Sequence, residues 1–392
     1  MQKRSRWFYF LTILMIVLLS ASGCVGADGE PAAPGNETLL SGDEQPGEDI
    51  VLGVLVPTSG SEAYFGNDML QAYELAVAEI NAAGGVLGRN LRLFAADDGC
   101  DANMAGQAAA RIVSHGVDFV VGGYCSSATL VAMPRFYDAN LLMLISASNS
   151  TEITNQGLNQ SFMLNSPGTH AAVTLAELCQ YLGVTSVALI HQGDSFTQNL
   201  SDLCEAILPQ HGIDIATVQV MNRGAADVSP IVTAILQSGA EMVYWTGYYA
   251  DGSNVIRQLR QGGFTGEIAV GDGSASRDLI TASGSAGEGV FVTSPPFVEF
   301  AEGGEEFVAS YYAMHGMEPG TFATLAYDTI YVLRQAIEES GTTDFETVRD
   351  AVQNIEYQGL SGLIKFNEDR ELAESNFIIL QIENGEFNLV RL

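Results

Sequence analysis

Beyond residue 49 the sequence alternates between short runs rich in β-branched residues and longer segments with the periodicity of an amphipathic helix. The first run, Ile50 to Pro57 (IVLGVLVP), predicts a buried strand followed by a turn. The segment from Asn67 to Ala83 has apolar residues at helical spacing and stops at Gly84-Gly85, which predicts a helix. An alternation of this kind predicts a parallel sheet with helices on both faces.

The alternation occurs twice, as two successive sets of elements. The first set continues with strands at 90–96, 118–122 and 141–145 and helices at 102–116 and 130–140. The second set has helices at 169–182, 195–211, 228–238 and 253–261 and strands at 186–191, 213–220, 242–246 and 267–270. In a chain of 392 residues, two such sets predict an α/β protein with two lobes.

The segments that follow the predicted strands are candidates for a binding site, because ligands of open parallel sheets bind beyond the carboxyl ends of the strands. These segments are rich in hydroxyl groups, glycines and aromatic rings and contain few charges. Such a composition suits a small polar ligand that is held by direct hydrogen bonds. The segments are 58–65, 97–101, 124–127, 146–151, 191–196, 247–249 and 271–274.

The N-terminal residues 1–23 have the pattern of an export signal. Lys3, Arg4 and Arg6 precede an apolar run from Trp7 to Leu19, which is too short to span a bilayer. Small residues follow the run and lead directly to Cys24, an arrangement that resembles a bacterial lipobox. The resemblance implies that Cys24 becomes a lipid-modified N-terminus, so the protein is expected outside the cytoplasm, anchored at the outer face of the cell membrane or in the periplasm. A short membrane anchor is the alternative.

Residues 24–48 have a different composition from the rest of the chain. Pro31, Pro34 and Pro46 lie among glycines and acidic residues, with few large apolar side chains. A segment of this composition cannot bury enough surface to fold, so it is predicted to be a flexible tether.

The net charge excludes one large class of partners. The chain has 47 acidic and 16 basic residues and a formal charge of −31, and only Lys3 and Lys365 are lysines. Nucleic-acid binding needs a basic surface, so this function is excluded. Hydrophobic residues make up 47% of the chain, which is enough to form a large core and excludes general disorder.

Four cysteines remain besides Cys24, namely Cys100, Cys125, Cys179 and Cys204. Outside the cytoplasm they are expected to pair. Three connectivities are possible, and the order of the elements favours one bond between the first two and one between the last two. A zinc site is the alternative for the four, although no CxxC or HxxxH spacing is present, and two buried free thiols are the alternative for the last pair.

Five groups of residues, in order and spread over the two predicted sets, resemble one known family. They are TSG at 58–60, EINAAGG at 79–85, DDGCD at 97–101, GGYCSS at 122–127 and GYY at 247–249. From about Ile50 to the C-terminus the chain is similar to the type I periplasmic solute-binding proteins of ABC importers, in particular the leucine/isoleucine/valine-binding proteins. The resemblance implies two interleaved Rossmann-like lobes with parallel sheets and a hinge, working with permease and ATPase subunits. It implies no catalytic step, no cofactor and no metal.

The resemblance also implies where the lobes divide. Lobe 1 is expected at 49–167 and 296–373, and lobe 2 at 168–295 and 374–392. The hinge is then expected at the three crossings, near Pro167, near Ser294-Pro295 and near Glu374.

The family's residue roles transfer to individual positions of this sequence. The family's disulfide corresponds to Cys100 and Cys125. Ser126, next to Ser127, matches the donor to the ligand's α-carboxylate, and Asp272 matches the acid that binds the α-ammonium group. The remaining matches are Ser148 and Asn149 for the head group, Phe196 and Tyr248 from lobe 2, and Phe65 and Tyr124 for the side-chain pocket. Asn149, Phe196 and Asp272 differ from the residue types that are usual in the family at these positions.

Each candidate also has a simpler structural interpretation. Ser126 and Ser127 could cap the following helix, because serine is a preferred N-cap residue. Asp272 lies between two glycines and could be a turn residue, and Phe65 and Tyr248 could be ordinary packing aromatics. His191 ends a predicted strand, where a single histidine is more often structural than catalytic.

The function expected from the sequence is capture of a small amino acid, branched-chain or related, by closure of two lobes, followed by delivery to a permease. The alternative is a sensor of amides, urea or amino acids that acts on a signalling partner. An enzyme or an enzyme activator on the same scaffold is a third hypothesis. It has little support, because the sequence contains no GxSxG, Walker, HExxH or strand-linked GxGxxG motif.

Overall fold

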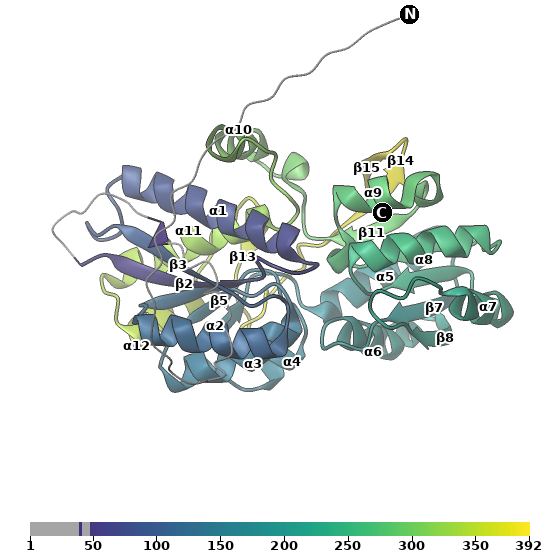
Figure 1. The fold of residues 1–392 in the computed structure, drawn as a ribbon, viewed down its shortest axis with the longest axis horizontal. Coiled ribbons are helices and arrows are strands. Elements are labelled where there is room, and N and C mark those ends of the chain that lie inside the picture. Colours follow the sequence, from purple (N-terminus) through teal and green to yellow (C-terminus); the bar gives the residue numbers. More distant parts are fainter. Residues whose placement is uncertain (1–38, 41–47) are drawn as a thin grey trace, which may run out of the picture. The chain divides into compact units, whose positions relative to one another are not determined.

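The computed structural model of the protein describes residues 39–40 and 48–392, so the predicted signal segment and Cys24 lie outside the described residues. Two large sheets organise the chain (Figure 1). The first has six strands in the order β1-β3-β2-β4-β5-β6, and the second has seven in the order β15-β14-β11-β10-β9-β7-β8. We call the first sheet with its helices lobe 1 and the second with its helices lobe 2.

The elements of lobe 1 come from two separate parts of the chain. Its sheet consists of β1 (Leu39–Leu40), β2 (Ile50–Val56), β3 (Leu91–Asp97), β4 (Phe119–Gly122), β5 (Met143–Ile145) and β6 (Ser161–Met163). Its helices are α1 (Ala63–Ala82), α2 (Ala102–His115), α3 (Ser126–Asp138), α4 (Glu152–Asn155), α10 (Gly304–His315), α11 (Ala323–Ser340) and α12 (Phe345–Gln353). A small hairpin of β12 (Tyr357–Gly359) and β13 (Gly362–Ile364) follows α12.

Strand β2 shows why this sheet is covered on both faces. Its successive side chains point to opposite faces, and Val54 and Leu55 are both fully buried. Val54 packs in a core that contains Tyr73 of α1 and Ile330 of α11. Leu55 packs in a second core with Phe136 of α3 and residues of α2. Figure 1 accordingly shows α1 and α11 on one side of the sheet and α2 and α3 on the other.

The elements of lobe 2 surround the seven-stranded sheet. The strands are β7 (Ser186–His191), β8 (Asp214–Val220), β9 (Met242–Trp245), β10 (Glu267–Val270), β11 (Phe291–Ser294), β14 (Ile378–Glu383) and β15 (Glu386–Val390). The α-helices are α5 (Gly168–Leu182), α6 (Thr197–Ile207), α7 (Ser229–Ser238), α8 (Tyr249–Gln261) and α9 (Arg277–Ser283). Short 3₁₀ turns are η1 (Leu208–His211), η2 (Asp272–Ser274), η3 (Gly284–Gly287) and η4 (Val298–Phe300), the last of which packs on α10.

The two lobes are interleaved, as the sequence resemblance implied. Strands β7 to β11 pair in parallel, whereas β14 pairs antiparallel with β11 and β15 pairs antiparallel with β14. The last two strands of the chain therefore belong to lobe 2, although α10, α11 and α12 come between them and β11 and pack on lobe 1. The predicted fold class is confirmed, and the residue boundaries of the lobes stay a prediction.

Three predicted helix starts are too late in the sequence. Helix α1 begins at Ala63, four residues before the predicted start at Asn67. Helix α3 begins at Ser126, four residues before the predicted start at 130, and α8 begins at Tyr249, four residues before the predicted 253. The first turns of α3 and α8 consist largely of small or polar residues, so they lack the apolar periodicity on which the prediction depended. The earlier starts of these two helices matter because they place Ser126 and Tyr248 at helix N-termini.

The predicted tether is not free along its whole length. Leu39 and Leu40 form the two-residue strand β1, which pairs antiparallel with β3. The backbone at this edge of lobe 1 offers unpaired hydrogen-bonding groups to which a short extended segment can add. This part of the tether is therefore held against the sheet in the structure.

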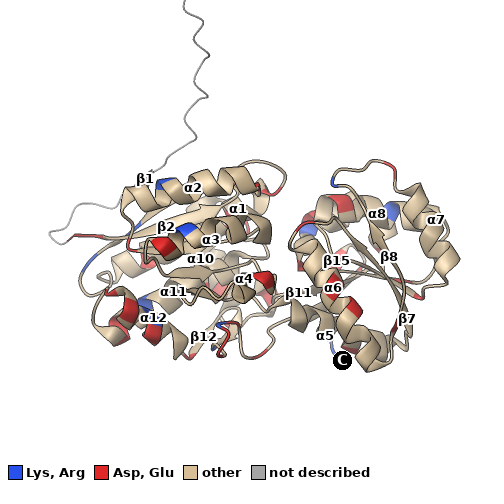
Figure 2. Cartoon of the chain, turned by 90° about the horizontal axis from the view of Figure 1, so that it is seen from below, with Lys and Arg blue, Asp and Glu red and all other residues tan. Residues whose placement is uncertain are grey.

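The acidic residues lie on both helices and loops. Figure 2 shows them spread over both lobes, with few basic residues among them. Asp202 and Glu205 of α6 and Glu346 and Asp350 of α12 are examples that are exposed to solvent. In the described part of the chain, no helix is both long enough and apolar enough to cross a membrane.

Candidate functional site

The loops at the carboxyl ends of β4, β5, β9 and β10 meet at a cavity between the two lobes. Both lobes supply side chains, as expected for strands whose carboxyl ends face a common cleft. The lining residues are Tyr124, Ala147, Asn149, Phe196, Tyr248, Asp272, Gly273 and Phe322. Five of the positions that the sequence singled out, Tyr124, Asn149, Phe196, Tyr248 and Asp272, are among them.

A disulfide fixes the lobe 1 side of the cavity. Cys100 and Cys125 are bonded, with their Cα atoms 5.4 Å apart, so the turn after β3 is tied to the residue that precedes α3. Before this bond, Gly122 and Gly123 turn the chain with φ angles of 123° and 80°. A Cβ atom at Gly122 would lie 2.2 Å from the carbonyl oxygen of Leu55, so only glycine fits there. The predicted Cys100–Cys125 pairing is confirmed.

Ser126 is the first residue of α3 and does not act as its cap. The N-cap residue is Cys125, which makes no side-chain capping bond. Ser126 is 1% exposed, and its hydroxyl accepts a hydrogen bond from the backbone N–H of Ser150 at 3.3 Å. The hydroxyl of Ser148, in the loop after β5, lies 2.8 Å from that of Thr129, which is in the first turn of α3. The loop after β5 is thus fixed to the N-terminus of α3, where free backbone N–H groups and the helix dipole favour an anion.

Asp272 supplies the one carboxylate among the described residues that line the cavity. It follows β10, is 2% exposed, and its Oδ2 accepts hydrogen bonds from Asn149 Nδ2 at 2.9 Å and Asn165 Nδ2 at 3.2 Å. Its Oδ1 is buried and has no hydrogen-bond partner among the described residues. Burial raises the pKa of Asp272 to about 6, and the amides of Asn165 and Asn149 with the backbone N–H groups of Asp272 and Gly273 only partly oppose the rise. A cation placed against Oδ1 would therefore stabilise the carboxylate.

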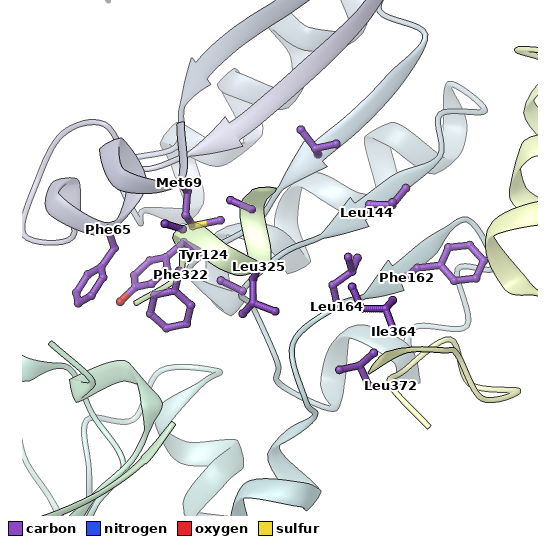
Figure 3. Packing of buried hydrophobic residues seen from close by; sticks show 14 of the residues in the cluster. Phe65, Met69, Tyr124, Leu144, Phe162, Leu164, Phe322, Leu325, Ile364 and Leu372 are labelled. Atoms are coloured by element: carbon purple, nitrogen blue, oxygen red, sulfur yellow. The ribbon is translucent and has the colours of Figure 1, made fainter. Parts of the chain in front are cut away.

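Aromatic rings from both lobes form the rest of the wall. The ring of Tyr124 is stacked on Phe65 at 5.0 Å between centroids and meets Phe322 edge-on at 5.3 Å. From lobe 2, Phe196 and Tyr248 lie 5.6 Å apart, and Tyr248 is 6.4 Å from Tyr124. Figure 3 shows Phe65, Tyr124 and Phe322 grouped together at this end of the lobe 1 core.

An ion pair links the lobes beside this aromatic wall. Arg223, in the loop after β8, lies 2.6 Å from Oε1 of Glu62, which directly precedes α1 and whose side chain is only 3% exposed. The guanidinium also lies over the ring of Tyr248, 4.6 Å from its centroid. Asp251 stabilises the loop that contains Arg223. It accepts hydrogen bonds from the backbone N–H of Gly224 and from the side-chain amide of Gln192. Through Arg223, the cavity-lining Tyr248 of lobe 2 is connected to Glu62 of lobe 1.

The second expected disulfide is absent, which corrects the prediction for Cys179 and Cys204. Both are free and fully buried, on α5 and α6 respectively. The Sγ atom of Cys179 lies 3.8 Å from Sδ of Met242, within the apolar core beneath the two helices. Burial raises the pKa of Cys179 to about 12, so the reactive thiolate is scarce, and that of Cys204 is also raised. They behave as small apolar core residues.

The remaining candidates lie outside the cavity lining. Ser127 follows Ser126 in α3 and is half-buried, and Phe65 contacts the cavity through Tyr124. His191 ends β7, where its Nδ1 accepts the backbone N–H of Gly193 at 3.2 Å and burial lowers its pKa. The neutral, hydrogen-bonded ring fits the structural interpretation. Among the described residues there is no group of three or more His, Cys, Asp or Glu side chains that could hold a metal ion.

Comparison with known proteins decides the family. A family model described as periplasmic binding protein matches residues 49–386. The chain belongs to the periplasmic binding protein family. The family resemblance inferred from the sequence is thereby confirmed.

Relatives of this periplasmic binding protein are similar over most of their length. The "Amino acid binding protein" of Pseudomonas aeruginosa is 28% identical over 337 residues, which are 85% of this chain and 90% of the relative. The "Leucine-, isoleucine-, valine-, threonine-, and alanine-binding protein" of the same organism is 27% identical over 338 residues, with coverage of 85% and 90%.

Solved structures agree with the fold of this periplasmic binding protein. The leucine binding protein LivK from Thermotoga maritima has a TM-score of 0.81 and 25% identity, and the match covers 87% of this chain and 98% of that protein. A solute-binding protein from R. palustris in complex with benzoate has a TM-score of 0.78, with coverage of 87% and 95%. Its identity is 14%, so it shows the shared fold alone.

Four residues near the cleft of this periplasmic binding protein were missed from the sequence. Asn165 lies two residues after β6. Had that short strand been predicted, Asn165 would have been a candidate, because ligands bind beyond the carboxyl ends of strands. Phe322 is the N-cap residue of α11, in a region where no elements were predicted. Glu62 lies within the predicted segment 58–65 but was not distinguished there, and nothing in the sequence pairs it with Arg223.

Proposed function

We propose that this chain is the extracytoplasmic substrate-binding component of an ABC importer and that its cleft captures a small zwitterionic amino acid. The observation that carries the proposal is the buried Oδ1 of Asp272, which lines the cavity without a partner among the described residues. An α-ammonium group is the cation that would satisfy it. The names of the relatives, which bind amino acids, support the same ligand class.

The opposite charge of the ligand would be held on lobe 1. The N-terminus of α3 offers backbone N–H groups and the hydroxyl of Ser126, which suit an α-carboxylate. The fixed loop containing Ser148 and Asn149 lies beside it, and Asn149 also donates to Asp272. The rings of Tyr124, Phe196, Tyr248 and Phe322 would surround the side chain, with Phe65 packed behind Tyr124. In this proposal the ligand bridges the two lobes through its charged head group.

The mechanism that we propose is closure without a chemical step. The ligand binds first to the rigid lobe 1 loops, and Tyr248 and Asp272 then arrive with lobe 2 and remove the ligand from water. A ligand stabilises the closed form only by binding that form better than the open one. The permease and its ATPase would then receive the ligand from the closed form.

Hydrogen bonds of Asn376 connect segments near the proposed hinge. Asn376, close to the third crossing, donates its backbone N–H to Ser166 Oγ at 2.9 Å and its side-chain amide to the carbonyl of Ser361 at 3.1 Å. Ser166 precedes the first crossing near Pro167. The first bond joins two of the proposed crossings, and the second ties the third crossing to the turn between β12 and β13 of lobe 1. They support a hinge between the proposed segments 49–167 with 296–373 and 168–295 with 374–392.

The ion pair between Glu62 and Arg223 is expected to slow ligand release. Changing Arg223 to alanine removes a lobe-to-lobe bond, leaves the buried Glu62 unpaired and frees the ring of Tyr248. The dissociation rate should rise about tenfold, since truncating one partner of a buried charge pair acts mainly on dissociation. Stopped-flow fluorescence of amino-acid release would measure it.

A matched control exists within lobe 1. Arg334 pairs with Glu338 at 3.0 Å and lies over the ring of Tyr331 at 6.0 Å, all on α11. Arg334→Ala should leave the dissociation rate unchanged. Equal dissociation rates for Arg223→Ala and the unaltered protein would show that the pair has no part in closure.

We also propose that Cys24 anchors the protein to the membrane through lipid, with residues 24–48 as the tether outside Leu39–Leu40. Cys24→Ala should leave the exported protein without lipid and shift it from the membrane fraction to the soluble fraction. Fractionation followed by mass spectrometry of the N-terminus would measure the change. Retention of the variant in the membrane fraction would rule out this anchor.

A further inference from the structure

In and around the cleft, more buried polar atoms lack partners than an amino-acid head group needs. Buried side-chain atoms without hydrogen-bond partners among the described residues include Asp272 Oδ1 and Asn165 Oδ1 at the proposed ammonium site. They also include Tyr124 Oη and Glu62 Oε2. An unpaired buried polar atom is costly, so each calls for a partner. The head group does not account for the second two.

Glu62 lies behind the aromatic wall that Tyr124 helps to form, close enough for its charge to act on the Tyr124 hydroxyl. Tyr124 lines the cavity and is 7% exposed. Its ring stacks on Phe65 of α1, the helix that directly follows Glu62. Glu62 is 2% exposed and uses only Oε1 to bind Arg223, which covers Tyr248. Burial, and then the Glu62 carboxylate, raise the pKa of Tyr124 well above its ordinary value. Figure 3 shows the Tyr124 hydroxyl at the free end of a ring that stands with Phe65 and Phe322.

The chemistry of these two atoms limits what can satisfy them. A carboxylate oxygen only accepts hydrogen bonds, and a tyrosine hydroxyl can accept as well as donate. A single NH₂ group has two hydrogens and can donate to both atoms. Arg223 already offsets the charge of Glu62, so a neutral donor is favoured over a second cation. The surrounding rings also suit a planar group.

We propose that the cleft selects an amino acid whose side chain ends in a carboxamide, with its NH₂ group donating to Glu62 Oε2 and Tyr124 Oη. This inference rests on the proposed function, because the head group must first bind at Asp272 and Ser126. A hydrocarbon side chain of the same size would leave both atoms buried and unpaired. A site built to hydrogen-bond a ligand rejects the analogue that lacks the group far more strongly than a hydrophobic pocket rejects an isostere.

Three natural amino acids of nearly equal shape provide the test. Leucine, asparagine and aspartate differ mainly in whether the branched end of the side chain is apolar, amide or anionic. We expect asparagine, or glutamine with one more methylene, to bind at least about tenfold tighter than leucine in calorimetric titrations of the full chain. Aspartate should bind far more weakly than asparagine, because its second carboxylate would face Glu62.

A single-atom variant tests the assignment of the hydroxyl. Tyr124→Phe should weaken binding of the amide by about tenfold and strengthen binding of leucine. Tyr327→Phe is the control, because it removes another tyrosine hydroxyl, bonded to Glu79 at 2.5 Å in lobe 1 outside the cleft.

The outcomes separate this inference from the proposed function. If leucine, isoleucine or valine binds as tightly as asparagine and glutamine, the amide site is wrong and the amino-acid function stands. An affinity for the amide that Tyr124→Phe does not change overturns the assignment of that contact. If none of these amino acids binds, the proposed function fails and this inference with it.

Discussion

Replacing Asp272 with asparagine is expected to weaken amino-acid binding by about 1.5–3 kcal/mol, which corresponds to roughly ten- to 150-fold in affinity. The change keeps the shape of the side chain and removes only its charge. The α-ammonium group would lose the carboxylate Oδ1 that has no other partner among the described residues. Isothermal titration calorimetry with an amino acid that binds the unaltered protein would measure the loss.

The same variant should become more stable without ligand. Burial raises the pKa of Asp272 from 3.8 to about 6, because the ionised carboxylate is less stable in the folded protein than in the unfolded chain. An acid with a raised pKa in the folded state contributes to the free energy of unfolding below pH 3.8, and this contribution is lost as the pH rises through about 6. For Asp272 the contribution at low pH exceeds that at high pH by roughly 3 kcal/mol. Asp272→Asn should therefore raise the free energy of unfolding at pH 7.5 and have little effect near pH 3.5. Urea unfolding at the two pH values would measure it.

The pH dependence of binding follows from the same shift. The ammonium group binds the ionised carboxylate, so binding below pH 6 must release a proton. Affinity should fall about tenfold between pH 7.5 and pH 5 in the unaltered protein and stay nearly level in Asp272→Asn.

The control for both measurements is Asp328. It is also a buried acid whose pKa burial raises to about 6, but it binds the backbone N–H groups of Leu360 and Ser361 in lobe 1. Asp328→Asn should leave amino-acid affinity unchanged. Wild-type affinity in Asp272→Asn would refute the ammonium site.

Removing the Cys100–Cys125 disulfide should cost about 3–4 kcal/mol of stability, because the bond closes a loop with a sequence separation of 25. Ligand affinity should fall as well, since the bond holds the residue before Ser126. Guanidinium unfolding of the double variant Cys100→Ser/Cys125→Ser would measure the loss, with Cys204→Ala as the control that leaves the disulfide intact.

Reducing agent adds a second readout for the cysteines. Dithiothreitol should destabilise the unaltered protein to about the level of the double variant. It should have no further effect on the double variant itself, because Cys179 and Cys204 are free. Sensitivity of the double variant to dithiothreitol would indicate that these two thiols form a disulfide after all.

Local sequence signals were sufficient for most strands that end at the cleft, and insufficient for β6, for α11 and for contacts across the cleft. Strands β7 and β10 begin and end at the predicted residues, because apolar β-branched runs bounded by turns carry that information locally. Tyr124, Asn149 and Asp272 lie in the segments that the strand-end rule indicated, and the family resemblance singled them out within those segments.

The missed residues have a different physical origin. Glu62 and Arg223 are 161 residues apart and meet only because the lobes fold against each other. Cys179 and Cys204 lie on helices that pack together, but whether two sulfur atoms bond depends on side-chain packing around Met242. Neither periodicity nor composition encodes such contacts.

Removing the ammonium group from the ligand tests whether the cleft recognises a zwitterion through Asp272. Calorimetric titrations at pH 7.5 would compare an amino acid that binds with its 2-hydroxy acid analogue, which has the same side chain and carboxylate. We expect the amino acid to bind and the hydroxy acid to bind at least about tenfold more weakly. Equal binding of the hydroxy acid, or tighter binding of a plain aromatic carboxylate such as benzoate, would contradict recognition of a zwitterion through Asp272.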